Sequence, residues 1–222
     1  MTRSVSAKLG VSLALTAVLC ALSYVLWDRP LLEVIRHLPP SYVHLGGRVS
    51  TLGRGEWYWA AGLSGAAAFW FVRRNYRLFH VVLYFCLSLA LGGILSTVLK
   101  FVFGRCRPCL FLQSQSYGFT WLGTQAAETS LPSGHCVTVA AAATSLWFVY
   151  PPLRPLYLLG MAAMMSARLL AEAHYLSDVV AGTYLGIVAA CIAFLLMRKW
   201  CGFGARDSEN GTGMILPMRE PL

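Results

Sequence analysis

The segment Leu131-Pro132-Ser133-Gly134-His135-Cys136 is a short polar interruption placed directly before the apolar run Cys136–Tyr150. Pro132 suits the start of a helix, because the N–H that proline lacks would have no helical partner there. Ser133 is a residue type that caps helices, and Gly134 lets another group approach the backbone closely. Unpaired first-turn amides and the helix dipole create positive potential at such an end. The segment therefore predicts an apolar helix whose N-terminus can bind an anion, with a histidine beside it.

The composition of the 222-residue chain is typical of a membrane protein. Hydrophobic residues make up 57% of the chain and charged residues only 12%, against roughly 25% charged residues in globular domains. The net charge is +9, from 18 Lys and Arg against 9 Asp and Glu. In a soluble protein this excess would indicate a nucleic-acid ligand. Here the basic residues flank or interrupt apolar runs, so we expect contact with a lipid bilayer and no nucleic-acid partner.

Apolar runs predict the fold. Because backbone polar groups within lipid must be paired inside the segment, each run is predicted to be a helix. The six runs are Leu9–Trp27, Trp57–Val72, Leu78–Leu99, Cys136–Tyr150, Leu156–Ala171 and Val179–Met197. Several are shorter than the ~20 residues that span a ~30 Å hydrocarbon core, so they must include flanking residues or tilt less. We predict an all-α polytopic bundle of six transmembrane helices over residues 1–201, and a polar, disordered cytoplasmic tail over residues 202–222.

The first run also resembles a signal peptide, because Arg3 and Lys8 precede it. Five more apolar runs follow, so we expect it to be retained as a membrane span. If every run crosses, the basic residues before the first run, between the second and third, and after the sixth share one side with both termini. The positive-inside rule then places that side, and both termini, in the cytoplasm. Five arginines oppose this bias from the other side: Arg29, Arg36, Arg48, Arg54 and Arg105.

Polar residues at the ends of the apolar runs form a second pattern. Lys100 ends the third run, Arg107 follows it, Ser133, Gly134 and His135 open the fourth, Arg168 lies near the end of the fifth, and His174 and Asp178 precede the sixth. Under the predicted topology all of them lie at the extracytoplasmic face. Charged residues at such depth are costly and usually functional. We therefore predict that they form one site at that face.

The residue types in this set indicate phosphate chemistry. Its three permanent cations match a group with two negative charges, and arginine can bind phosphate bidentately. The two histidines can divide the roles of nucleophile and general acid. His174 and Asp178 are four residues apart, so the carboxylate can hold one imidazole nitrogen and raise the nucleophilicity of the other. No third histidine or carboxylate cluster indicates a metal ligand set, and we predict neither a metal nor a cofactor.

Three of the seven cysteines lie near the predicted extracytoplasmic helix ends. Cys106, Cys109 and Cys136 could oxidise there, so a disulfide among them is left open. The segment Cys106-Arg107-Pro108-Cys109 has CxxC spacing, but no second pair completes a zinc site.

Three motifs carry a resemblance to a known family. They are Lys100-(six residues)-Arg107-Pro108, then Pro132-Ser133-Gly134-His135, then Arg168-(five residues)-His174-(three residues)-Asp178. In order and internal spacing they resemble the type 2 phosphatidic acid phosphatase (PAP2) family, which shares its site with vanadium haloperoxidases. One position departs from the pattern: the family usually has Ser immediately before the third-motif arginine, where this chain has Ala167. The missing hydroxyl weakens phosphate positioning but removes no catalytic group.

The resemblance implies a role for each matched residue. His174 attacks phosphorus to give a phosphohistidine, with Asp178 orienting it, and His135 protonates the leaving oxygen and later activates water. The phosphoryl oxygens are held by Lys100, Arg107, Arg168, Ser133 and the Gly134 amide. These roles agree with the chemistry argued above from the residue types, in which cations and helix-terminus amides stabilise the charge that develops during phosphoryl transfer.

The function implied is that of an integral membrane lipid phosphatase that needs no metal. The family acts on isoprenyl pyrophosphates, phosphatidic acid, phosphatidylglycerophosphate and lipid A phosphates, and a small chain with an outward site is typical of a bacterial inner membrane protein with a periplasmic active site. One alternative is a lipid-to-lipid phosphotransferase of the same fold. Another is a non-catalytic phospholipid-binding transporter, although no broken, repeated helices indicate one. The substrate among these lipids and the oligomeric state stay open.

Overall fold

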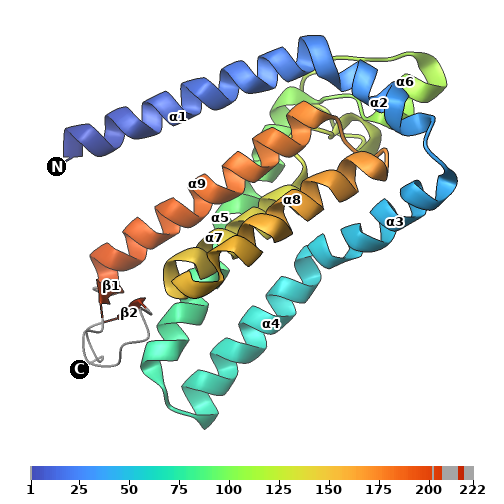
Figure 1. Cartoon of the computed structure of the whole chain (residues 1–222). Helices are drawn as coiled ribbons and strands as arrows, with labels where there is room; N and C mark the ends of the chain where they lie inside the picture. Colours follow the sequence, from blue (N-terminus) through green and yellow to red (C-terminus); the bar gives the residue numbers. More distant parts are fainter. Residues whose placement is uncertain (1, 202, 207–214, 218–222) are drawn as a thin grey trace.

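Each of the six apolar runs is helical in the computed structural model, which describes residues 2–201, 203–206 and 215–217 (Figure 1). The α-helices are α1 (Thr2–Leu22), α2 (Asp28–Arg36), α3 (Pro40–Ser50), α4 (Gly55–Ala67), α5 (Tyr76–Phe103), α6 (Pro108–Ser114), α7 (Gly134–Val149), α8 (Arg154–Leu170) and α9 (Leu176–Cys201). π-Helical turns at Ser23–Trp27 and Ala68–Val72 join α1 to α2 and extend α4, and short 3₁₀ turns occupy Thr51–Gly53, Ala126–Glu128 and Pro151–Leu153. The predicted helical fold is confirmed.

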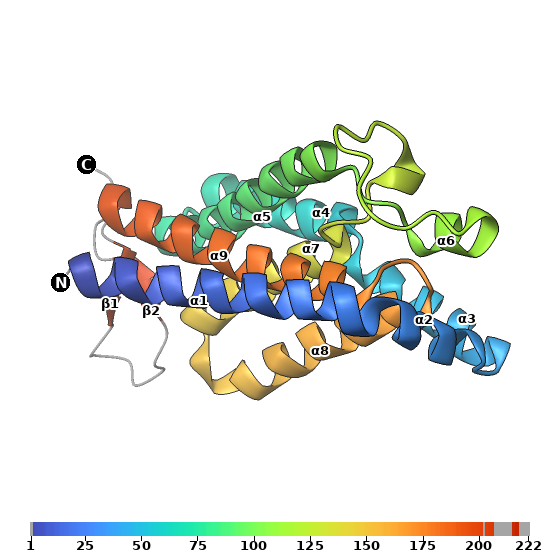
Figure 2. The same ribbon diagram turned by 90° about the horizontal axis from the view of Figure 1, so that it is seen from above.

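The helix that follows the polar segment, α7, lies at the centre of the bundle. It contacts α5, α8 and α9, and both views show it enclosed by these helices (Figures 1 and 2). Its small side chains, including the buried run Ala140–Ala143, allow close helix packing. Two glycines of α9 are required for this contact. A Cβ at Gly182 would lie 2.6 Å from the Ser133 carbonyl oxygen, and one at Gly186 would lie 2.4 Å from that of Val137.

The outer helices expose apolar side chains. Helix α1 runs beside α9 (Figure 2), where the Ser12 and Tyr184 hydroxyl oxygens lie 2.9 Å apart. Large apolar side chains exposed on it include Val11, Leu13 and Leu15. Helix α3 packs on α8, and α4 packs on α5. A water-soluble bundle would bury such faces, so they are the surfaces that lipid covers in a membrane protein.

Three helical stretches are long and apolar enough to cross a membrane: Ala7–Arg36, Tyr76–Phe103 and Leu176–Cys201. Gly134–Val149 is apolar but shorter. The protein is therefore transmembrane, and the count of six spans stays a prediction for α4, α7 and α8.

Different connecting segments lie at the two ends of the bundle. The N-terminus, the link between α4 and α5, and the turn between α7 and α8 lie at one end, and α2 and α6 lie at the other (Figure 1). Of the tail that was predicted to be disordered, the structure describes β1 (Phe203–Arg206) and β2 (Ile215–Pro217), which pair antiparallel. The prediction for the rest of residues 202–222 lies outside the described part of the chain.

Candidate active site

All of the predicted site residues gather at the end of the bundle that carries α2 and α6. Lys100 lies in the last turn of α5 and Arg168 in the last turn of α8, whereas Ser133 caps α7 and Asp178 lies in the first turn of α9. Because these helices alternate in direction, the C-terminal ends of α5 and α8 lie at the same end of the bundle as the N-terminal ends of α7 and α9. Arg107, which directly precedes α6, and Arg168 are close enough for their charges to act on both Lys100 and His174.

His174 is held by its Nδ1 atom. This nitrogen lies 3.6 Å from Asp178 Oδ2 and 3.4 Å from the hydroxyl oxygen of Ser130. Ser130 donates its own hydroxyl proton to Asp178 Oδ2 at 2.6 Å, so its oxygen is left to accept from the imidazole. A proton on Nδ1 satisfies both neighbours, and Nε2 then keeps its lone pair. The i,i+4 contact therefore forms as predicted, although His174 lies just before α9 rather than within it.

Burial sets the protonation state of His174. Its side chain is 2% exposed, and burial lowers the pKa of His174 to about 4; Arg107 and Arg168 act in the same direction, while Asp178 opposes them. The imidazole is therefore neutral near pH 7, as a nucleophile must be.

Several buried hydrogen-bond donors of the site have no partner in the described part of the chain. Three of them are the Ser133 hydroxyl, Arg107 Nε and Arg168 Nε; Arg105 Nε and the Tyr175 hydroxyl also lack a partner. Buried polar groups are normally satisfied, so three orphaned donors at one place indicate a missing acceptor. Ser133 sits at the N-cap of α7 as predicted, but its side chain makes no capping bond, which leaves the hydroxyl for a ligand.

The three cations of the site have no acidic partner. Among the described residues, the ion pairs join Arg105 to Asp28, Arg105 to Asp178, and His174 to Asp178. The Lys100 ammonium donates to the Thr129 carbonyl oxygen at 3.0 Å, and none of the three cations forms an ion pair within these residues. Partly buried cations without counter-ions favour a polyanion as the ligand.

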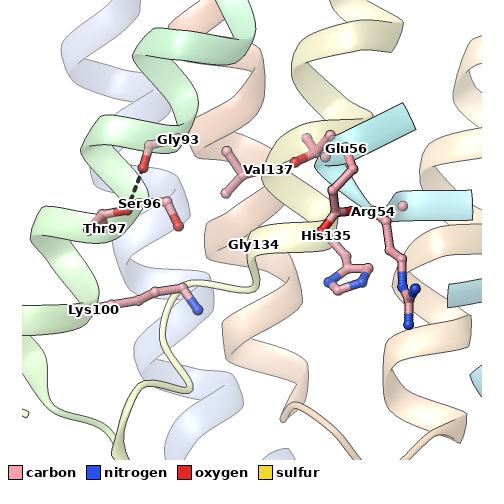
Figure 3. Close-up of a pocket in the computed structure, with 12 residues that line it drawn as sticks. Arg54, Glu56, Gly93, Ser96, Thr97, Lys100, Gly134, His135 and Val137 are labelled. Atoms are coloured by element: carbon pink, nitrogen blue, oxygen red, sulfur yellow. Dashed lines mark hydrogen bonds between the residues drawn. The ribbon is translucent and has the colours of Figure 1, made fainter. Parts of the chain in front are cut away.

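Part of the site opens into a cavity of about 580 Å³ between α4, α5 and α7 (Figure 3). Lys100, Gly134 and His135 line it, with Lys100 reaching in from α5 and His135 from the first turn of α7. The other predicted site residues do not line this cavity. His135 is therefore the histidine that faces the open side, and His174 is the enclosed one.

Arg105 and Asp28 belong to the site and were not predicted. Sequence reasoning treated Arg105 only as a charge that opposes the topology and assigned no role to Asp28. The Arg105 guanidinium, 1% exposed, donates to the carboxylates of Asp28 and Asp178 and to the Ser177 hydroxyl. It is surrounded by the rings of Tyr24, Tyr117, Phe119 and Tyr175, whose centroids lie 4.8–5.9 Å from the guanidinium carbon.

Asp28 connects the first helices to the start of α9. Its carboxylate accepts from the Ser177 amide at 2.9 Å, from the Ser177 hydroxyl at 2.6 Å and from Arg105. Ser177 lies between His174 and Asp178 in the chain, so Asp28 and Arg105 fix the segment that carries both. The one signal in the sequence was a charge beside an apolar run, which many residues share.

Three further predictions concern residue chemistry at this end. All seven cysteines are free, so the disulfide left open is not formed. Within the described residues no three His, Cys, Asp or Glu side chains gather as metal ligands would. Ala167, where the family pattern has serine, is 3% exposed, and the neighbouring Ser166 is exposed and does not replace the hydroxyl.

Residues 81–201 match the sequence model of the PAP2 superfamily, a segment that contains every predicted site residue. Two lipid A 1-phosphatases align over 128 residues, 58% of this chain: that of Rhizobium etli is 29% identical over 55% of its length, and that of Rhizobium johnstonii 27% over 52%. The chain thus spans about half the length of these relatives.

Two solved structures share the fold. The crystal structure of Aquifex aeolicus LpxE has a TM-score of 0.58 at 21% identity, over 75% of this chain and 93% of its own. A transmembrane PAP2-type phosphatidylglycerolphosphate phosphatase from Bacillus subtilis has a TM-score of 0.58 at 17% identity, over 86% and 96% of the two chains.

Proposed function

The chain belongs to the PAP2 superfamily, and from this premise we propose that it is a membrane lipid phosphatase, which hydrolyses a phosphate monoester or pyrophosphate of a membrane lipid. The observation that carries this proposal is the set of orphaned donors, Ser133 Oγ, Arg107 Nε and Arg168 Nε, beside a neutral, oriented histidine. A binding protein needs the donors alone. The nucleophile and its carboxylate partner add the means to break a bond.

The first step transfers the phosphoryl group to His174. Its Nε2 lone pair forms a bond to phosphorus as the bond from phosphorus to the lipid oxygen breaks, and His135 gives its proton to that oxygen. Lys100, Arg107, Arg168 and the first-turn amides of α7 stabilise the charge on the equatorial oxygens. Asp178 and Ser130 stabilise the positive charge that His174 acquires, through its Nδ1 proton.

The second step releases phosphate. His135, now neutral, takes a proton from a water molecule whose oxygen attacks phosphorus, and the bond from phosphorus to His174 breaks. Inorganic phosphate leaves, and both histidines return to their starting protonation states. In this scheme the arginines and Lys100 do the electrostatic work that a metal ion does in other phosphatases, so the proposed reaction is metal-independent.

The substrate is a lipid phosphate that enters from the bilayer. The two lipid A 1-phosphatases support a lipid phosphate as the substrate class, and phosphatidic acid, phosphatidylglycerophosphate and isoprenyl pyrophosphate belong to the same class of ligand. The cavity lined by Lys100 and His135 is large enough for a lipid head group, since ligand cavities measure roughly 300–1,000 Å³.

We place the protein in a bacterial inner membrane with the site on the periplasmic side. The site lies at one end of the bundle, and the arginine-rich link between α4 and α5 lies at the other (Figure 1). The positive-inside rule then supports a cytoplasmic location for the link and for both termini.

Release of inorganic phosphate from lipid phosphates by the detergent-solubilised protein tests the proposal. Wild-type protein should release phosphate, His174→Ala should not, and His80→Ala serves as a matched control. His80 lies on α5 and bonds through Nδ1 to the Tyr76 carbonyl oxygen, away from the site. A wild-type protein that binds lipid phosphate without releasing phosphate would contradict the proposal.

A further inference from the structure

The side of the cavity opposite α5 carries two charges that the reaction scheme does not use. Arg54 immediately precedes α4 and Glu56 lies in its first turn, and both line the cavity that His135 faces. In Figure 3 Glu56 extends toward His135 and Arg54 lies next to it, both on the α4 side, and Lys100 approaches from the other wall. Their charges are close enough to act on the His135 imidazole.

Neither charge is used within the protein. Among the described residues, no ion pair or side-chain hydrogen bond involves Arg54 or Glu56. In particular, Glu56 does not neutralise Lys100, although both line one cavity. A carboxylate beside a phosphate site lowers the affinity for phosphate, so phosphate binding alone does not account for it.

The position of His135 identifies what these two side chains meet. In the proposed reaction His135 protonates the leaving oxygen, so the part of the lipid attached to that oxygen lies next to it. Arg54 and Glu56 line the cavity beside His135. The phosphate-binding residues Arg107, Arg168 and Ser133 do not line it, and therefore Arg54 and Glu56 face the leaving group and not the transferred phosphoryl group. An ionised glutamate only accepts hydrogen bonds and an arginine only donates them.

We infer that Arg54 and Glu56 recognise the head group of the substrate, and that this head group is a sugar or similar polyol with hydroxyl or amide groups on the carbons beside the phosphate ester. This inference rests on the proposed function and names the substrate class. Hydroxyl groups both donate and accept, so one head group satisfies both side chains. Thr97, on the opposite wall, donates to the Gly93 carbonyl oxygen and keeps an acceptor lone pair for the same ligand.

The other lipid phosphates fit this pair less well. A diacylglycerol or prenyl group would place ester groups or hydrocarbon beside the charges of Arg54 and Glu56. Such a group removes water from both side chains but supplies no hydrogen-bond donor for Glu56. A pyrophosphate places a second negative charge where Glu56 lies. Loss of one hydrogen bond to a charged group costs about 1.5–3 kcal/mol, or roughly 10- to 150-fold in affinity.

The test compares two substrates of matched acyl length in detergent micelles, an acylated glucosamine 1-phosphate and dioctanoyl phosphatidic acid. We expect the wild-type protein to prefer the sugar phosphate. Arg54→Ala and Glu56→Ala should each lower kcat/KM for the sugar phosphate about 10-fold or more, and should change kcat/KM for phosphatidic acid less than about 3-fold. Turnover of phosphatidic acid reports that each variant is folded. Arg48→Ala, on α3, and Glu33→Gln, on α2, are the matched controls and should leave the ratio unchanged.

Each other outcome overturns the inference. Equal losses on both substrates would show that the pair acts through His135 and not on the head group. If the variants keep the wild-type ratio of kcat/KM for the two substrates, or if the wild-type protein prefers phosphatidic acid, Arg54 and Glu56 do not recognise a sugar head group. The proposed function would stand in either case. A wild-type protein that hydrolyses neither of these lipids, nor phosphatidylglycerophosphate or isoprenyl pyrophosphate, would remove the proposed function itself.

Discussion

Replacing Asp28 by Asn tests whether Arg105 positions the catalytic dyad. In the wild-type protein one buried guanidinium donates to two buried carboxylates, Asp28 and Asp178. Asp28 also accepts two hydrogen bonds from Ser177. Asparagine keeps the shape of the side chain but has one acceptor oxygen, so its NH₂ group must face a donor of Ser177 or Arg105. The substitution therefore removes a negative charge and places the asparagine NH₂ group, a donor, next to another donor at the start of α9.

The structure sets the size of the effect. Removing one partner of a buried ion pair costs about 3–5 kcal/mol. Here Arg105 retains Asp178 and Ser177, and asparagine retains one acceptor, so we expect about 2–3 kcal/mol, which for a domain of this size corresponds to a fall in Tm of about 5–10 °C. The full charge of Arg105 then acts on Asp178 and weakens its interaction with His174. We expect kcat to fall about 10-fold, equivalent to about 1.4 kcal/mol, with KM unchanged.

Thermal unfolding in detergent and phosphate release at saturating lipid measure the two effects. Glu33→Gln, on the same helix as Asp28, is the control for loss of a carboxylate and should leave Tm and kcat unchanged. A wild-type Tm and kcat in Asp28→Asn would refute the reasoning. A lower Tm with wild-type kcat would show that Asp28 stabilises the fold without positioning the dyad.

Three further predictions concern pH, metals and topology. Because the pKa of His174 is about 4 in the folded state and about 6.5 in the unfolded state, the unfolded state binds more protons between these values. The free energy of unfolding of the wild-type protein should therefore fall as pH decreases from 6.5 to 4. In denaturant titrations at several pH values, His174→Asn should show a smaller fall over this range. Equal slopes of unfolding free energy against pH in the two proteins would contradict the assignment. Phosphate release should continue in a chelator and be inhibited by vanadate, and an absolute requirement for Mg²⁺ would oppose the reaction scheme. Cysteines placed at the exposed positions Gln115 and Thr124, in a variant without Cys109, should react with an impermeant reagent on intact cells; labelling only after permeabilisation would reverse the orientation.

The sequence predicted those parts of the fold that carry a local signal. The third apolar run was expected over Leu78–Leu99, and α5 covers Tyr76–Phe103. Its ends lie beyond the apolar run because Asn75 caps the helix through the Leu78 amide at 3.1 Å, and because Gly104 adopts the left-handed conformation that stops it. Hydropathy locates a helix, and capping chemistry, which hydropathy does not measure, sets its ends.

The predicted site residues share one property, a polar or charged group at the edge of an apolar run. Asp28, Arg105 and Ser130 have the same property or lie nearby, but their role depends on contacts across the fold. Arg105 reaches Asp178 over 73 positions and Asp28 over 77. Such pairs follow from how α1, α5 and α9 pack, which spacing within one segment does not determine.

The division of labour between the two histidines is the central claim, and a burst experiment with an activated substrate tests it most directly. Either alanine variant should lose at least ~10³-fold in lipid hydrolysis, because the two histidines act as one unit. A nitrophenyl phosphate has a leaving group that needs little protonation, so His135→Ala should still show a burst of nitrophenol with phosphate trapped on His174. His174→Ala should show no burst and no phosphohistidine. A burst that survives in His174→Ala and disappears in His135→Ala would contradict the assignment and reverse the two roles.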